Sequence, residues 1–280
     1  MPATHHPLAT HLAERLRLTD ENDSPLGTED AAAFAEEFRT IYATMAEHEH
    51  RIDIVIASFA SRFLPALVER YNSVPHVISP YATMMRALLD SGYFAKFMRG
   101  PWGSNLYRLQ AERLAEVDVR GDTVNALDGM ENAIVILVYL MVYSKHYHRN
   151  VMPPASETKT KLIPVLRSIQ GIYARKLEKI HIPPGKIPSF DVRNMQAVFR
   201  NARDAELFLL DQLTIDKMLG AVGKMMPWVT CAGYDTGCWV KGKQKGRMSC
   251  GRCETQTYCS KEHQKLDWPV HKLSCFETVY

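Results

Sequence analysis

The chain has 280 residues, of which 46% are hydrophobic and 23% are charged. These values are close to the averages of globular proteins, and they exclude a wholly disordered chain. At roughly 100–200 residues per domain, the length allows one or two domains. The longest unbroken apolar run, Ala133 to Tyr143, has 11 residues, whereas a membrane-spanning helix needs about 20, so we expect no membrane association. The first residues lack the basic start and apolar stretch of a secretory signal, so we expect an intracellular protein, in the nucleus or the cytoplasm.

Net charge separates the end of the chain from the rest. The chain carries 34 lysines and arginines against 31 aspartates and glutamates, a formal net charge of +3. Residues 231–280 contain eight basic and five acidic residues, so the first 230 residues are neutral overall. A protein that binds nucleic acid through its general charge has a much larger basic excess, so we do not expect nucleic acid as a partner.

Apolar residues before residue 225 recur at helical spacing. From Phe34 to Met45 they fall on one face of a helix with a period of 3.6 residues, and the same spacing runs from Ile52 to Leu67. The pattern predicts helices over residues 28–45, 52–67, 79–89, 104–117, 130–149, 156–180 and 191–221. Alternation with a period of two is scarce, so no sheet is predicted. The fold class is therefore mainly α, with a helical domain over residues 1–225 whose role the sequence does not reveal.

Three local signals refine these helices. Ser79 followed by Pro80 marks a helix start, because serine caps a helix and proline is tolerated at its first position. Pro65 interrupts its apolar row and should kink the helix or begin a new one. Residues 130–149 are apolar on almost every side, which predicts the central helix of the domain.

All six cysteines lie between Cys231 and Cys275. With two histidines they form pairs with the spacings C-x6-C, C-x2-C, C-x3-H and H-x3-C, and the candidate ligands are Cys231, Cys238, Cys250, Cys253, Cys259, His263, His271 and Cys275. A two-residue gap lets a tight turn aim both sulfurs at one ion, and a three-residue gap puts two ligands on one face of a helical turn. Eight such donors complete two tetrahedra, which suits two structural Zn²⁺ ions with no open position for a catalytic water.

Spacing alone leaves alternatives open. The four pairs can combine sequentially, nested or interleaved. A single zinc ion that leaves out the wide pair Cys231 and Cys238, three disulfides, and reduced thiols without metal are further readings of the same residues. Clustered thiols in an intracellular protein favour metal ligands over disulfides.

The segment from Tyr258 to Cys275 reads YCSKEHQKLDWPVHKLSC. It resembles the second half of a MYND-type zinc finger, whose pattern has an aromatic-Cys-Ser step, a Cys-Gln pair, Asp-Trp, His-Lys and a final Cys. The resemblance implies an interleaved, cross-braced finger over residues 231–275, in which one zinc is held by Cys231, Cys238, Cys259 and His263 and the other by Cys250, Cys253, His271 and Cys275. His263 stands where the family usually has cysteine, an exchange that zinc accepts. A C-terminal finger behind a helical region resembles fungal MYND-domain proteins.

Gln264 and Trp268 lie within this segment but are not candidate ligands. They are four residues apart, so on a helix they face the same way. In the MYND family the corresponding residues line a shallow groove that binds short proline-rich peptides, so the resemblance implies a peptide-binding role for both. The alternative is that Trp268 only packs the small core of the finger.

The sequence allows two alternative functions from different classes. The first is a non-enzymatic adaptor that recruits a protein partner, through a proline-containing peptide, to its C-terminal finger. The second is an enzyme, because some proteins with MYND fingers are SET-domain lysine methyltransferases. Those enzymes insert the finger within the catalytic domain and continue with an Asn-His-Ser-Cys-like cofactor strand, and no such segment occurs in this sequence. The adaptor is therefore the preferred interpretation, and no catalytic residue is assigned.

Overall fold

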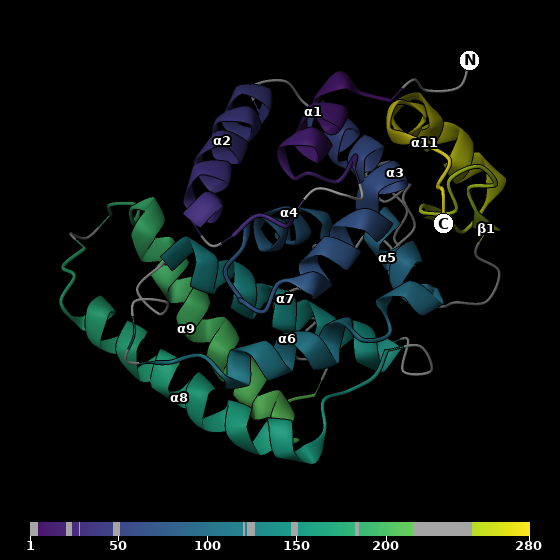
Figure 1. The fold of residues 1–280 in the computed structure, drawn as a ribbon. Helices are drawn as coiled ribbons and strands as arrows, with labels where there is room; N and C mark the ends of the chain where they lie inside the picture. Colours follow the sequence, from purple (N-terminus) through teal and green to yellow (C-terminus); the bar gives the residue numbers. More distant parts are fainter. Residues whose placement is uncertain are drawn as a thin grey trace.

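The computed structural model describes residues 5–20, 24–27, 29–46, 51–119, 121, 127–146, 151–182, 185–214 and 248–280. Within these ranges the chain is mainly helical, as predicted (Figure 1). Before residue 215 the elements are α1 (Pro7–Arg15), α2 (Glu29–Ala46), α3 (Arg51–Ser73), α4 (Pro80–Leu88), α5 (Gly92–Arg99), the short 3-10 helix η1 (Pro101–Gly103), α6 (Leu106–Ala115), α7 (Leu127–His146), α8 (Ser156–Glu178) and α9 (Phe190–Leu209).

Helix α7 is the central element of this bundle. It contacts α4, α6 and α9, and every residue from Ala133 to Tyr143 is buried. Its segment Leu127–Lys145 has the length and apolar composition of a membrane span, but 72% of that window is buried inside the fold. Burial on all sides explains why the helix is apolar all round, because it has no face that water must solvate.

Local signals in the sequence account for several helix boundaries. The side chain of Ser79 accepts a hydrogen bond from the amide of Ala82 at 3.1 Å, so Ser79 caps α4 as predicted. Helix α3 continues through Pro65 to Ser73, so the proline does not begin a new helix. Residue Thr28, the predicted start of another helix, lies outside the described residues.

The last long helix ends earlier than the sequence suggests. Helix α9 stops at Leu209, whereas the apolar pattern predicts a helix to residue 221. Asp211 has a φ of 56°, in the left-handed region, and the chain cannot continue a right-handed helix through such a residue. Residues 215–221 lie outside the described residues.

Among the α-helices described before residue 215, α1 and α5 lie outside the predicted ranges. Helix α5 has only eight residues, fewer than the roughly 11–18 residues over which helical periodicity can be recognised. It also begins with Gly92, a poor helix former, and depends on the Ser91 side chain, which accepts a hydrogen bond from the amide of Phe94.

The C-terminal segment, residues 248–280, forms a small unit of two short strands and one helix. Strands β1 (Met248–Ser249) and β2 (Thr257–Tyr258) pair antiparallel, with Met248 opposite Tyr258, and helix α11 (Lys261–Ser274) follows. Two residues per strand are too few to show an alternating pattern, which is why the sequence predicts no sheet here.

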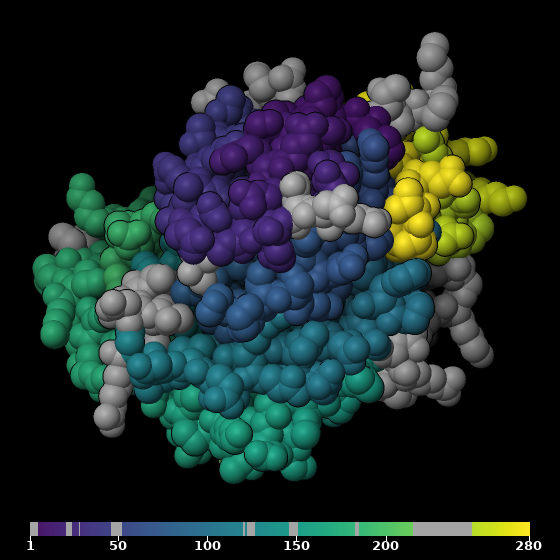
Figure 2. Space-filling view, in the orientation of Figure 1, coloured from purple at the N-terminus to yellow at the C-terminus, as the bar shows by residue number. Residues whose placement is uncertain are grey.

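This C-terminal unit lies against the helices near the N-terminus. Helix α11 packs on α3, and in Figure 2 the yellow C-terminal residues lie against the blue residues of the helical part. One continuous hydrophobic cluster contains both the helical core and the C-terminal residues Cys250, Cys253, Tyr258, Cys275 and Phe276. The predicted boundary between the helical domain and the finger, between residues 225 and 231, lies outside the described residues.

Candidate metal centre

Four of the predicted ligands meet at one point. The ligand atoms of Cys250, Cys253, His271 and Cys275 all lie within 4.8 Å of one another, and all four residues are buried. Cys250 and Cys253 come from the turn after β1, His271 lies in the last turn of α11, and Cys275 directly follows that helix. These are the four residues that the interleaved arrangement assigns to a single zinc ion.

Two of the distances between these donors match the edges of a tetrahedral zinc site. With Zn–S bonds of about 2.3 Å and a Zn–N bond of about 2.0 Å, a tetrahedron has S–S edges of about 3.8 Å and S–N edges of about 3.5 Å. The Sγ atoms of Cys250 and Cys275 are 3.7 Å apart, and Cys253 Sγ is 3.4 Å from His271 Nε2. The residues therefore fit a zinc ion bound through three sulfurs and Nε2 of His271.

The surroundings of Cys253 favour the thiolate that a metal requires. Its pKa is lowered, first because it accepts a hydrogen bond from Cys275, whose own pKa the same contact raises, against the opposing effect of burial, and further because of hydrogen bonds from His271 and Thr255. The Thr255 hydroxyl donates to Cys253 Sγ at 3.2 Å. Thr255 is itself buried, so this donor is held in place beside the metal centre.

The structure describes only two of the four predicted ligands of the other zinc site. Cys259 and His263 lie at the start of α11, where Ser260 caps the helix, and Cys259 Sγ is 2.8 Å from His263 Nδ1. This distance is shorter than the S–N edge of about 3.5 Å in a zinc tetrahedron, so the two atoms must separate to hold an ion. Their predicted co-ligands Cys231 and Cys238 lie outside the described residues. The four cysteines among residues 248–280 form no disulfide.

Gln264 and Trp268 lie on α11, beside the metal centre. Trp268 is 41% exposed, and its ring meets the ring of His271 edge to face, with centroids 5.9 Å apart. Gln264 is half-buried. The indole therefore has one edge against a metal ligand and a large surface open to solvent.

Comparison with known families agrees with this geometry. The profile of the MYND finger matches residues 238–275. Residues 238–275 are a MYND finger. The match includes seven of the eight predicted ligands and begins at Cys238, which leaves Cys231 outside it.

Similarity to individual proteins is confined to the same segment. Egl nine homolog 1 of Mus musculus is 50% identical over 38 residues, which are 14% of this chain and 10% of that protein. Egl nine homolog 1 of Homo sapiens is 47% identical over 38 residues, 9% of its length. N-lysine methyltransferase SMYD2 of Gallus gallus is 49% identical over 39 residues, which are 14% of this chain and 8% of that protein. The match thus spans a tenth or less of each relative, and no solved structure matches the chain.

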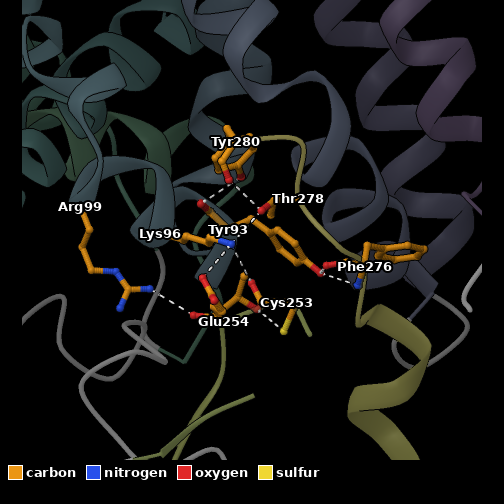
Figure 3. A network of polar contacts seen from close by, with 9 residues as sticks. Tyr93, Lys96, Arg99, Cys253, Glu254, Phe276, Thr278 and Tyr280 are labelled. Atoms are coloured by element: carbon orange, nitrogen blue, oxygen red, sulfur yellow. Dashed lines mark hydrogen bonds and ion pairs between the residues drawn. The ribbon is translucent and has the colours of Figure 1, made fainter. Parts of the chain in front are cut away.

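The MYND finger is joined to α5 by a network around Tyr93 (Figure 3). The Tyr93 hydroxyl accepts a hydrogen bond from the amide of Phe276 at 2.7 Å and lies 2.8 Å from the carbonyl oxygen of Ser274 and 3.0 Å from that of Phe276. Burial raises the pKa of Tyr93, so it stays a neutral hydroxyl that both donates and accepts. This single side chain therefore fixes the backbone on either side of the ligand Cys275.

Two basic residues of α5 hold the other ligand-bearing loop of the MYND finger (Figure 3). Lys96 Nζ donates to the carbonyl oxygen of Cys253 at 3.4 Å and to Thr278 Oγ1 at 2.7 Å, and it forms an ion pair with Glu254 at 3.1 Å. Arg99 donates to the carbonyl oxygen of Glu254 at 3.1 Å. The loop that carries Cys253 is therefore positioned by residues of the helical part.

The sequence alone did not point to these positioning residues. Tyr93 and Lys96 are more than 150 residues before the atoms that they bind, so no spacing rule relates them to the cysteines. Lys96 alone carries a signal in the sequence. It is a charged residue between apolar neighbours, and a lysine in a buried segment needs polar partners.

Proposed function

We propose that this protein is a zinc-binding adaptor that recruits a partner protein, and that a proline-containing peptide of the partner binds at Gln264 and Trp268. The observation that carries the proposal is the exposure of Trp268 beside a buried metal centre. A tryptophan that only filled the core would be covered, whereas a half-open indole can pack on a pyrrolidine ring while a glutamine bonds the peptide backbone. Thiolate ligands persist where thiols stay reduced, so the proposal includes an intracellular location.

We further propose that the protein has no catalytic activity of its own. Its likeness to the methyltransferase SMYD2 covers only the MYND finger and 8% of that protein, so it gives no support for methyl transfer in the helical part. The described metal centre has four protein donors, which leaves no position for a reactive water. Binding of S-adenosylmethionine, measured by calorimetry, would contradict this proposal.

We expect the purified chain to contain two zinc ions, held by the eight donors named above. Replacing Cys231 with serine should reduce the count to one, because Cys231, Cys238, Cys259 and His263 would form the second site and a serine hydroxyl is a poor zinc ligand. Native mass spectrometry of the intact protein gives the count directly. Lys241→Ser, a change in the same segment at a residue that is not a donor, is the control and should keep two ions. Two ions in Cys231→Ser would remove Cys231 from the ligand set.

We expect Trp268→Ala to weaken binding of a proline-containing peptide by about 30-fold, because truncating a tryptophan anchor costs about 2 kcal/mol or more. Fluorescence anisotropy with labelled peptides selected from a proline-containing array measures the change. The binding constants of Trp268→Ala and the parent are compared at the same salt concentration.

Two controls separate recognition from folding in this experiment. Trp268 touches His271, so the variant must first be shown to keep the zinc content of the parent. Leu273→Ala removes an exposed apolar side chain from another face of α11 and should bind the peptide as tightly as the parent. If Trp268→Ala keeps its metal and its affinity, the tryptophan is a packing residue and the peptide-binding proposal is wrong.

A further inference from the structure

A large cleft lies between the MYND finger and the helical part. It has a volume of about 790 Å³ and is lined by residues of α2, α3, α4, α5, α7 and α9 on one side and by the finger on the other. The finger contributes Thr255, Gln256 and one face of α11 that includes Val270 and His271. Sites that bind small molecules or short peptide segments have volumes of about 300–1,000 Å³, so the cleft is large enough for a ligand. Neither Gln264 nor Trp268 lines it.

The charged residues of the cleft are mostly acidic. Two arginines line it, Arg39 and Arg86, and both are engaged, the first with Asp128 at 3.4 Å and the second with Asp90 at 3.7 Å. The carboxylates that line it are Asp53, Asp90, Asp128, Glu131 and Asp267. Five carboxylates and two guanidinium groups give a formal net charge of −3, so the cleft attracts cations.

Glu131 is the carboxylate best placed to receive a positive charge. It lies on α7, is half-buried, and makes no hydrogen bond or ion pair with any described residue. Burial raises its pKa, as does the neighbouring Asp128, while Arg86 opposes the shift. A cationic group of a ligand beside Glu131 would relieve this cost, because it stabilises the ionised carboxylate where water does so poorly.

Polar atoms without partners gather on the same lining. Among the described residues, five buried side-chain polar atoms have no hydrogen-bond partner, and three of them belong to residues of the cleft: Arg86 Nε, Gln256 Oε1 and His271 Nδ1. His271 is only 4% exposed and uses its other nitrogen toward the metal centre. Two donors and one acceptor in one lining can pair with the carbonyl and amide groups of a bound peptide, and native proteins normally pair such buried groups.

Large apolar side chains also line the cleft. Tyr42 of α2 and Phe190 at the start of α9, on the helical side, and Val270 of α11, on the finger side, are each about half-exposed. Large exposed apolar side chains that rim a charged cleft are typical of surfaces that bind another protein.

We propose that this cleft binds a segment of a partner protein that carries a lysine or an arginine between apolar residues, with the cation beside Glu131 and the apolar residues against Tyr42, Phe190 and Val270. The charge of the lining selects the basic residue, and its apolar side chains select the neighbouring residues. This site is separate from the proline-peptide site at Gln264 and Trp268. The adaptor would then hold its partner at two places, one on the MYND finger and one between the finger and the helices.

Two pools of nine-residue peptides test this proposal on the full-length, zinc-loaded protein. One pool has lysine or arginine at its centre and the other has glutamate, and the remaining positions vary among alanine, leucine, valine, serine and glutamine. The immobilised protein is incubated with both pools, and the retained peptides are counted by mass spectrometry. We expect the basic pool to be retained about tenfold more than the acidic pool, with the preference decreasing as salt is raised.

Variants connect this preference to the cleft. Glu131→Gln should reduce the preference for basic peptides about fivefold, and Tyr42→Ala should reduce retention of both pools. Glu157→Gln, which removes a carboxylate on the exposed side of α8, is the matched control. It should leave the preference for basic peptides and the retention of both pools unchanged. Each variant is first shown to match the parent in zinc content and thermal midpoint.

The results separate this proposal from the alternatives. Equal retention of the two pools, or a preference unchanged in Glu131→Gln, would overturn it. A dimer that forms with rising concentration and is lost in Tyr42→Ala would assign the cleft to a second copy of the chain and would also overturn it. Trp268→Ala should retain the basic pool as the parent does, so failure of the proline-peptide site and failure of this site are distinguishable.

Discussion

Replacing Cys253 with serine should unfold the MYND finger and also lower the thermal midpoint of the helical part by about 5–10 °C. Zinc supplies about 10–16 kcal/mol of folding free energy to a small zinc module, and the cluster around Cys253 is the buried centre of this one. When the finger unfolds, Phe276 leaves the shared hydrophobic cluster and Tyr93 loses its partners. For a domain of this size a loss of about 1 kcal/mol lowers the midpoint by about 2–4 °C, so a loss of about 2–3 kcal/mol accounts for the shift.

Circular dichroism on heating, together with the zinc content, measures this effect. The helical part contains no cysteine before residue 215, and we expect it to keep its helices at room temperature in the variant. Chelation of zinc from the parent should reproduce the result, and added zinc should reverse it. A helical midpoint that stays unchanged in Cys253→Ser would show that the finger does not stabilise the helices.

Replacing Tyr93 with phenylalanine should destabilise the protein by about 2–4 kcal/mol without removing a metal ligand. The hydroxyl binds the amide of Phe276 and the carbonyl oxygens of Ser274 and Phe276 in a buried position, so its loss leaves buried polar groups unpaired. Each such group costs about 1–3 kcal/mol. Chemical denaturation gives the free energy of unfolding, and hydrogen exchange at the Phe276 amide reports the local opening.

Tyr107→Phe is the matched control for this change. Tyr107 lies on α6 and is as buried as Tyr93, but its hydroxyl makes no hydrogen bond with any described residue. Its replacement should change the free energy of unfolding by less than about 1 kcal/mol. If the two variants lose the same stability, the Tyr93 network is not what fixes the MYND finger to α5.

A close contact between two backbone segments also joins the MYND finger to α5. A Cβ atom on Gly92, the first residue of α5, would lie 2.6 Å from the carbonyl oxygen of Thr255 in the finger loop. Only glycine fits a helix start that approaches another backbone so closely. The residue that makes α5 hard to predict from helix propensity is therefore the one that allows the finger to dock there.

The spacing of residues along the chain predicts the local structure of this protein, namely individual helices, a helix start and one pair of ligands. The row of apolar residues predicts α2 and the central helix α7, and Ser79 predicts the start of α4, because helix periodicity and capping depend on residues within one or two turns. The pair His271 and Cys275 is predicted for the same reason, since an i, i+4 spacing puts two ligands on one helical face. The end of α9 was missed because a single left-handed residue, Asp211, overrides the apolar pattern.

The tertiary structure decided how these parts meet. Cys253 and His271 reach one point only because β1, β2 and α11 fold back on one another, and spacing alone allowed several pairings. Tyr93 and Phe276 are 183 residues apart, and the lining of the cleft comes from seven helices and the finger loop. Contacts over such separations depend on how whole helices pack against one another, which local spacing does not encode. The sequence therefore predicted the four residues that meet at the candidate metal centre, whereas only the packed structure showed that the MYND finger and the helices share one core and enclose an acidic cleft.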